Sequence, residues 1–234
     1  MRAAGSGRAF KPAVVTGLII SFAIVAGGIG TIRNANYALE FDETAKDIHD
    51  GVLLTPSTLA RQSADAIALN EQGALHGGAL EDASIITTAF ALSPDLAPVL
   101  RPGVLVSAEA INRTRVAEAP ADSHAWIRIV MLHSARLGID PFVLEALRMS
   151  RLTGPREFAV MWPSLRFRVE HWQQLPDAER DGASDIAAGL WLRASRPDLI
   201  AYFRSLTPDL RAKLLDRMTN SKAKAALEPL LRTQ

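Results

Sequence analysis

Apolar side chains recur along this chain at spacings of three and four residues, with glycine or proline where most runs end. This period places the apolar positions on one face of an α-helix, and Ser57 after Pro56 is a suitable N-cap. Strand-forming residues do not alternate with polar ones over more than a few positions. The pattern predicts an all-α fold with helices over residues 57–72, 79–93, 102–119, 124–137, 141–152, 155–172, 176–195, 197–206 and 208–218.

Prolines separate these predicted helices into pairs. Pro56, Pro94, Pro120 and Pro155 stand at uneven intervals between successive pairs. A helix pair cannot bury its apolar face alone, so a run of pairs favours a solenoid in which neighbours stack. Residues 56–234 are therefore predicted to form one degenerate, helical repeat-like domain.

The N-terminal region has a different composition. Residues 12–32 contain no charged side chain and are long enough to cross a bilayer as a helix. We expect residues 1–11 to form a short cytoplasmic tail and residues 33–55 a juxtamembrane stalk. A cleaved signal peptide ending near residues 25–27 is the alternative, although its apolar region would be unusually long.

Charge predicts the orientation of this anchor. The first 33 residues carry four basic groups, whereas all 25 acidic residues of the chain lie beyond them. Because basic flanks stay in the cytoplasm, the C-terminal domain is expected outside it, in the periplasm if the host is a bacterium. The net charge is only +1 and cysteine is absent, so neither nucleic-acid binding nor a disulfide framework is predicted.

The segment from His124 to Pro155 resembles a tetratricopeptide repeat. That repeat has a tryptophan in its first helix, a small residue at the turn, alanine and aromatic residues in its second helix, and a closing proline. Five residues of this chain match those positions and are expected to pack the repeat: Trp126, Gly138, Phe142, Ala146 and Pro155.

Residues 124–206 also resemble the VpsP-like group of single-pass proteins linked to polysaccharide biosynthesis. The matching features are Trp126, the segment Ala146–Glu157, Arg166 with Arg168, the segment Leu175–Arg180, and Pro197. This resemblance implies an inner-membrane accessory protein of surface polysaccharide synthesis or export, whose partners are other envelope proteins. A glycan is a further candidate partner, and no cofactor is implied.

Tryptophans and arginines alternate in the C-terminal third of the chain. Aromatic faces beside guanidinium groups can stack on sugars or hold an acidic polymer, although tryptophans at this spacing also fill junctions between helices. The candidate binding surface consists of Arg156, Trp162, Arg166, Arg168, Trp172, Trp191 and Arg193.

A glycan-cleaving enzyme, or a regulator of one, is the alternative from another class. The segment after Gly138 resembles the start of the catalytic helix of lytic transglycosylases, in which a glutamate precedes a serine. Here Met149 precedes Ser150, which leaves only Glu145 or Glu157 as the acid. The five histidines form no recognisable zinc spacing, so no catalytic, cofactor-binding or metal-binding residue is predicted.

Overall fold

A computed structural model describes residues 36–193 and 196–232, and within these ranges every regular element is helical. The predicted all-α class is confirmed for this part of the chain. Residues 36–49 form the first described helix. The others are α2 (Pro56–Glu71), α3 (Gly77–Ala91), α4 (Arg101–Glu118), α5 (Ser123–Leu137), α6 (Pro141–Thr153), α7 (Phe158–Glu170), a 3₁₀ turn η1 (Trp172–Gln174), α8 (Asp177–Arg193), α9 (Arg196–Ser205), α10 (Pro208–Asp216) and α11 (Ser221–Arg232).

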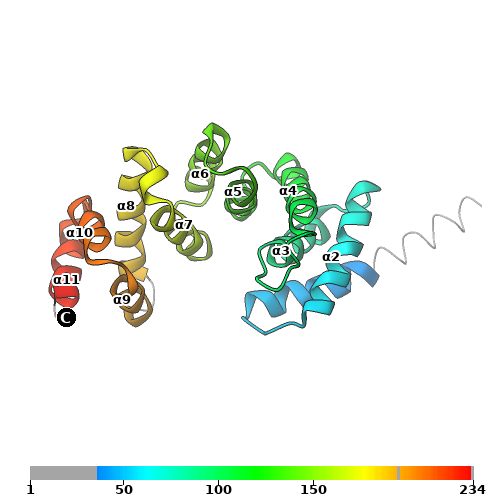
Figure 1. Ribbon diagram of the computed structural model, residues 1–234, viewed down its shortest axis with the longest axis horizontal. Helices are drawn as coiled ribbons and strands as arrows, with labels where there is room; N and C mark the ends of the chain where they lie inside the picture. The colour runs from blue at the N-terminus through cyan, green and yellow to red at the C-terminus, as the bar shows by residue number, and fades with distance from the viewer. Residues whose placement is uncertain (1–35, 194–195, 233–234) are drawn as a thin grey trace, which may run out of the picture.

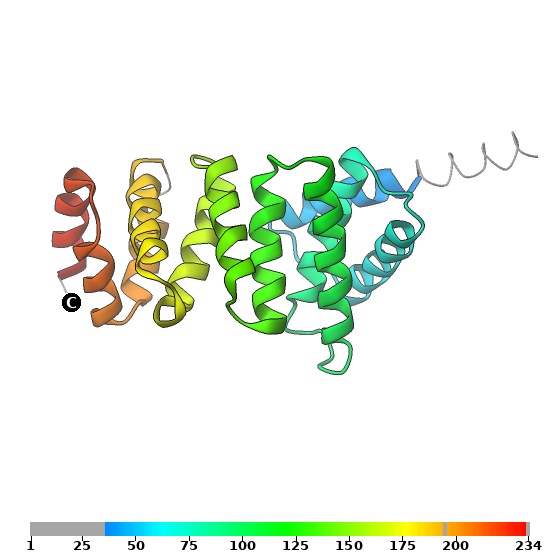
Figure 2. The ribbon, with the colours of Figure 1, turned by 90° about the horizontal axis from the view of Figure 1, so that it is seen from above.

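The helices stack side by side along one axis, from α2 at one end to α11 at the other (Figure 1). In the middle of the molecule α3, α5 and α7 form one row, and α4, α6 and α8 form a second row above it. Figure 2 shows α4, α5 and α6 running nearly parallel in space as neighbours in the stack. Each helix therefore packs mainly against those close to it in sequence.

Apolar side chains fill the space between the helices along the whole stack. Phe41, Leu80 and Ile86 belong to a cluster at the N-terminal end, and Ile129 and Leu147 to one in the middle. The largest cluster extends from α7 to α11 and includes Leu165 and Phe203. Burial of apolar surface stabilises such a stack by about 25 cal/mol per Å². This holds the helices together, because no single helix could bury its apolar face alone.

Local side-chain chemistry sets several helix starts. Thr55, not Ser57, is the N-cap of α2: its hydroxyl accepts the Thr58 N–H at 3.2 Å, and Pro56 occupies the first helical position. Proline suits that position because its missing N–H needs no partner there. Asp122 and Asp140 cap α5 and α6 in the same way, accepting backbone N–H groups at 3.0 Å and 2.9 Å.

Two further boundaries differ from the prediction. Helix α7 begins at Phe158, because residues 155–157 form a turn after α6. Helix α11 was not predicted, although its apolar residues Ala223 and Leu227 stand four apart and are fully buried.

Residues 36–49 do not form a separate stalk. Phe41 is fully buried in the cluster that also contains Ala66 of α2 and Ile111 of α4. The predicted boundary at residue 55 is therefore wrong, because this helix is part of the helical fold. The predicted transmembrane segment 12–32 lies outside the described residues, and no described helix is long and apolar enough to cross a membrane.

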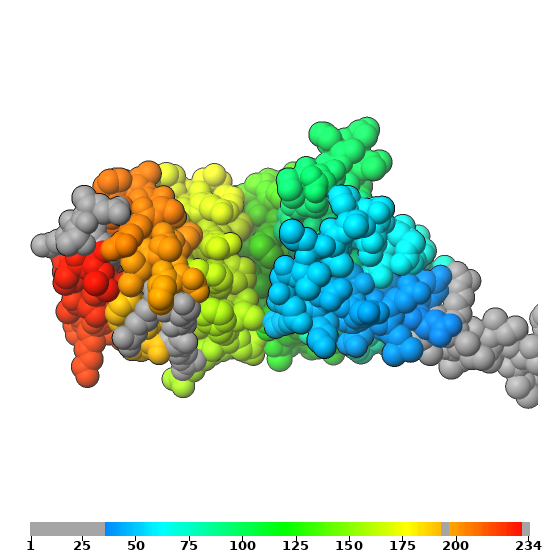
Figure 3. All heavy atoms as spheres, turned by 90° about the horizontal axis from the view of Figure 1, so that it is seen from below, coloured from blue at the N-terminus to red at the C-terminus, as the bar shows by residue number. Residues whose placement is uncertain are grey.

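The face of the molecule formed by residues 36–49, α2, α5, α7 and α9 is hollowed. Figure 3 shows α5 set back between the N-terminal helices on one side and α7 with α9 on the other. We call this region the concave face. It positions the candidate site described next.

Candidate binding surface

Trp162, Arg166 and Tyr202 form an aromatic and cationic group at the edge of the concave face. The Trp162 and Tyr202 rings meet edge to face, with their centroids 5.3 Å apart. The exposed Arg166 guanidinium lies 5.4 Å from the Trp162 ring centroid and 5.9 Å from that of Tyr202. Arginine over aromatic rings is an attractive cation–π arrangement, so these three side chains support one another.

A hollow of about 270 Å³ adjoins this group between α5 and α7. Its lining contains apolar side chains, such as Met131 and Phe167, together with the opposite charges of Arg166 and Glu170. Burial, followed by the nearby Glu170 carboxylate, raises the pKa of Tyr202 to about 12, so its hydroxyl remains protonated at neutral pH. Trp162, Arg166 and Glu170 can therefore offer a ring, a guanidinium and a carboxylate to one ligand in this hollow.

Three members of the predicted surface are instead buried. Trp172 and Trp191 are 4% and 8% exposed and belong to the C-terminal core cluster, where they fill the junction between helices. Arg168 is fully buried and donates from Nε and Nη2 to one oxygen of Glu179, at 3.0 Å and 2.7 Å. The prediction that these residues face a ligand is wrong, because their helix faces point into the stack.

The remaining members are divided between two places. Trp162 and Arg166 lie together beside the hollow between α5 and α7. Arg156 is exposed and lines a different cleft, between α6 and α8. The side chain of Arg193 lies outside the described residues. Sequence reasoning missed Tyr202, because no pattern indicated that α9 would bring it against α7.

The five residues matched to a tetratricopeptide repeat differ in their burial and in their contacts. Ala146 is buried, whereas Trp126 is half-buried and donates its indole N–H to the Pro120 carbonyl at 2.9 Å. Gly138 ends α5 with φ of +79°, a conformation that other residues rarely adopt. Phe142 packs 4.9 Å from the His133 ring, between centroids. Pro155 is exposed and is not a packing residue, because it lies in the turn after α6.

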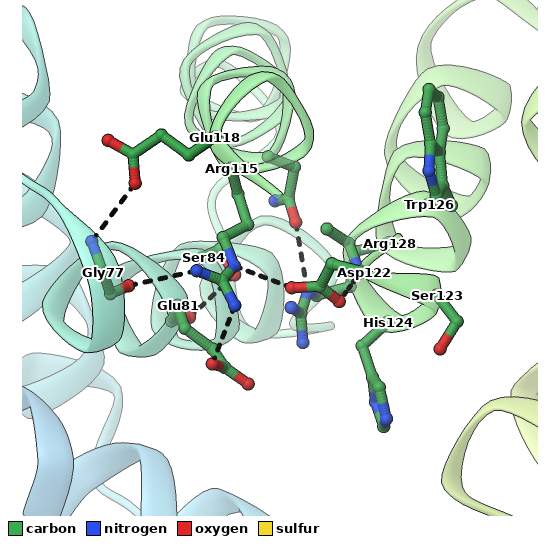
Figure 4. Close-up of polar contacts among 12 residues, drawn as sticks. Gly77, Glu81, Ser84, Arg115, Glu118, Asp122, Ser123, His124, Trp126 and Arg128 are labelled. Atoms are coloured by element: carbon green, nitrogen blue, oxygen red, sulfur yellow. Dashed lines mark hydrogen bonds and ion pairs between the residues drawn. The ribbon is translucent and has the colours of Figure 1, made fainter. Parts of the chain in front are cut away.

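A polar network joins α3, α4 and the start of α5 (Figure 4). Arg115 of α4 donates to Asp122 at 2.7 Å, to Glu81 at 3.1 Å and to the Gly77 carbonyl at 3.3 Å. Burial alone would raise the pKa of Asp122, but the bonds from the Ala125 N–H and Arg115 outweigh it, so this pKa is lowered. The network fixes the relative positions of α3, α4 and α5.

The two acids of the enzyme alternative, Glu145 and Glu157, have different polar partners. Glu145 is exposed and hydrogen-bonds Arg148, which lowers the pKa of this carboxyl, whereas a general acid needs a raised pKa. Glu157 accepts the Ser123 hydroxyl at 2.5 Å and lies 3.2 Å from His124 Nε2. Within the described part of the chain, no group of three or more His, Asp or Glu side chains is placed to hold a metal ion.

Comparison of the chain with protein-family models, with curated proteins and with solved structures gives no match.

Proposed function

We propose that this protein is a non-enzymatic scaffold that binds its partner on the concave face. The observation that carries the proposal is the placement of Arg166 over the rings of Trp162 and Tyr202, beside an open hollow. Such groups contribute large, rigid contact areas with one charged centre, which is typical of binding surfaces. The stacking of α3 to α8 as successive pairs is in keeping with a degenerate tetratricopeptide-like solenoid.

A more specific proposal concerns the cellular location of the protein and the pathway in which it acts. Residues 12–32 would anchor the protein in a bacterial inner membrane, with residues 1–11 in the cytoplasm and the helical domain in the periplasm. The resemblance to VpsP-like proteins then suggests an accessory role in the assembly or export of a cell-surface polysaccharide. Sugar rings stack on aromatic side chains, and a guanidinium pairs with acidic sugars. The part of Trp162 that lines the hollow, together with Arg166, therefore suits a glycan or a glycan-bound subunit.

The proposal is tested by measuring surface and secreted polysaccharide, by amount and chain length, in a strain that lacks the gene. The deletion strain is complemented with the wild-type protein, with a form exported without residues 1–33, and with a Trp162→Ala/Arg166→Gln variant. We expect polysaccharide to fall in the deletion strain and to recover only with the wild-type protein.

Immunoblots of each strain establish that the variants accumulate to equal levels. A Lys213→Gln/Lys222→Gln variant, which removes two exposed charges from α10 and α11, serves as the matched surface control. Unchanged polysaccharide in the deletion strain would refute the pathway. Full complementation by the Trp162→Ala/Arg166→Gln variant would refute the proposal that the partner binds on the concave face.

A further inference from the structure

A cleft of about 470 Å³ lies between the end of α6, the start of α7 and one side of α8. It is lined by residues of α6, of the turn after α6, of α7 and of α8, and it shares no lining residue with the hollow at Trp162. Its volume is within the range of sites that bind small molecules or short peptide segments. The concave face described above does not account for it.

Two glycines within α8 allow side chains of the cleft wall to lie close to this helix. A Cβ atom at Gly182 would lie 3.3 Å from Nη1 of Arg151, and one at Gly189 would lie 2.6 Å from Cε of Met161. A glycine inside a helix lowers its stability by about 1 kcal/mol relative to alanine. Two glycines on the same side of α8 therefore need a structural explanation. The packing supplies one: both allow a side chain that lines the cleft to lie directly on the α8 backbone.

The charge of the lining is mainly positive. Arg151 and Arg156 both line the cleft, and Arg151 makes no hydrogen bond or ion pair with the described residues. Asp185 is the acidic residue of the lining, and it already accepts the Thr219 hydroxyl at 2.9 Å. Arg168 lies behind the wall but is neutralised by Glu179. An anionic group would therefore be attracted to this wall, first of all by Arg151.

The apolar part of the lining is aliphatic. Met161, Ile186 and Leu192 contribute to it, and Leu192 is 63% exposed although it is a large apolar side chain. No aromatic ring lines this cleft among the described residues, in contrast to the concave face. Sugars favour aromatic walls, whereas aliphatic walls suit leucine-like or valine-like side chains.

We infer that the cleft between α6 and α8 binds a segment of a partner protein in which carboxylates stand next to aliphatic side chains. The arginines would pair with the carboxylates as charge-assisted hydrogen bonds, and the aliphatic side chains would cover Ile186 and Leu192. The glycines of α8 let Arg151 and Met161, two side chains of the cleft wall, lie against that helix. This interaction is independent of the one proposed for the concave face.

The test uses the full chain, purified in a mild non-ionic detergent, and a fluorescein-labelled octapeptide that alternates aspartate and leucine. Fluorescence anisotropy is recorded as protein is added, with detergent alone as the blank. We expect saturable binding whose Kd rises at least about tenfold in Arg151→Gln/Arg156→Gln, because the loss of even one charge-assisted pair weakens binding by about that factor. Gly189→Leu, which collides with Met161 and so reshapes the cleft without changing its charge, is expected to weaken binding as well.

Matched controls separate this site from general charge attraction and from the concave face. Lys213→Gln/Lys222→Gln removes the same charge elsewhere and should bind like wild type, as should Trp162→Ala/Arg166→Gln. Circular dichroism and the thermal midpoint establish that each variant is folded. Equal binding by all variants, no saturable binding, or equal binding of an octapeptide of lysine and leucine would overturn the proposal. Tighter binding of an oligogalacturonate than of the acidic peptide would also overturn it, in favour of an acidic glycan.

Discussion

Arg168 and Glu179 form an ion pair inside the helix stack: both Nε and Nη2 of the arginine donate to the same glutamate oxygen, at 3.0 Å and 2.7 Å. Arg168 is fully buried, and its Nη1 also donates to the Ser164 carbonyl. The pair joins α7 to α8. Removing one partner of such a pair leaves an uncompensated buried charge, whereas removing both does not.

We therefore expect Arg168→Met to lower the free energy of unfolding by about 3–5 kcal/mol, and Arg168→Met/Glu179→Gln to recover part of that loss. Urea denaturation followed by circular dichroism measures both. The exposed pair Lys213–Asp209 is the control, since Lys213→Gln should change stability by less than about 0.5 kcal/mol. Equal losses at the two pairs would contradict the buried role of Arg168.

A second prediction concerns Glu109 and the change in the free energy of unfolding at low pH. This buried carboxylate accepts from His133 Nδ1 at 3.0 Å, from Arg113 at 2.6 Å and from Arg136 at 3.0 Å. Burial would raise its pKa, but the bonds from these three residues outweigh burial, so the pKa of Glu109 is lowered. A folded-state pKa below the unfolded value gives stability that is present above the unfolded pKa and is lost as pH falls through the folded pKa.

Glu109→Gln should therefore cost about 2–3 kcal/mol at pH 7 and progressively less as the pH is lowered, because the wild-type carboxylate is then protonated. Urea denaturation at several pH values between 7 and 3 measures the difference. Glu71→Gln, at the exposed end of α2, is the matched control and should change little. A loss that is constant with pH would show that the carboxylate charge is not what stabilises this cluster.

The third prediction concerns Asp82, whose effect on the pH dependence of stability should be opposite to that of Glu109. Burial, followed by the neighbouring Asp42 and Glu81 carboxylates, raises the pKa of Asp82 from 3.8 to about 6. Between these values the folded protein holds a proton that the unfolded chain releases, so this group lowers stability as pH rises through that window. Asp82→Asn should raise the free energy of unfolding by about 1 kcal/mol at pH 7.5, after allowance for solvent screening, and give no gain at pH 4.

Urea denaturation of Asp82→Asn at these two pH values measures the effect. Asp95→Asn, in an exposed loop, is the control for the same chemical change. Equal gains at pH 4 and pH 7.5 would rule out carboxylate repulsion as the cause.

Gly154 gives a prediction about close packing. A Cβ atom there would lie 2.4 Å from both Cβ and Oγ of Ser123, which is buried at the start of α5. Gly154→Ala should therefore cost about 1–3 kcal/mol by overpacking, and Ser123→Gly in the same chain should restore part of it. Gly103→Ala, in α4 with open space around it, should instead stabilise the protein by about 0.5–1 kcal/mol. Thermal and urea unfolding of the variants compare these effects, and similar losses at both glycines would refute the packing argument.

The sequence by itself determined the helical class and most of the helices. Apolar spacing and the residues that start or end a helix act within a few neighbours, so α5 begins one residue before its predicted start and α6 at the predicted one. The same local signals left α11 undetected, and they placed the N-cap of α2 two residues late, at Ser57 instead of Thr55.

Only the tertiary structure decided which arginines and tryptophans are available to a ligand. Arg166 and Arg168 are two residues apart on α7, which separates them by about 200° around the helix axis. One of them therefore points into the stack and the other toward solvent, but the choice depends on where α8 and α9 pack. The fold buries Arg168 against Glu179 and places Arg166 over Tyr202, a residue of a helix that no local pattern links to α7. Packing between helices that are distant in sequence sets these positions. Such contacts cannot be predicted from the spacing of residues along the chain, because that spacing reflects only local helix geometry.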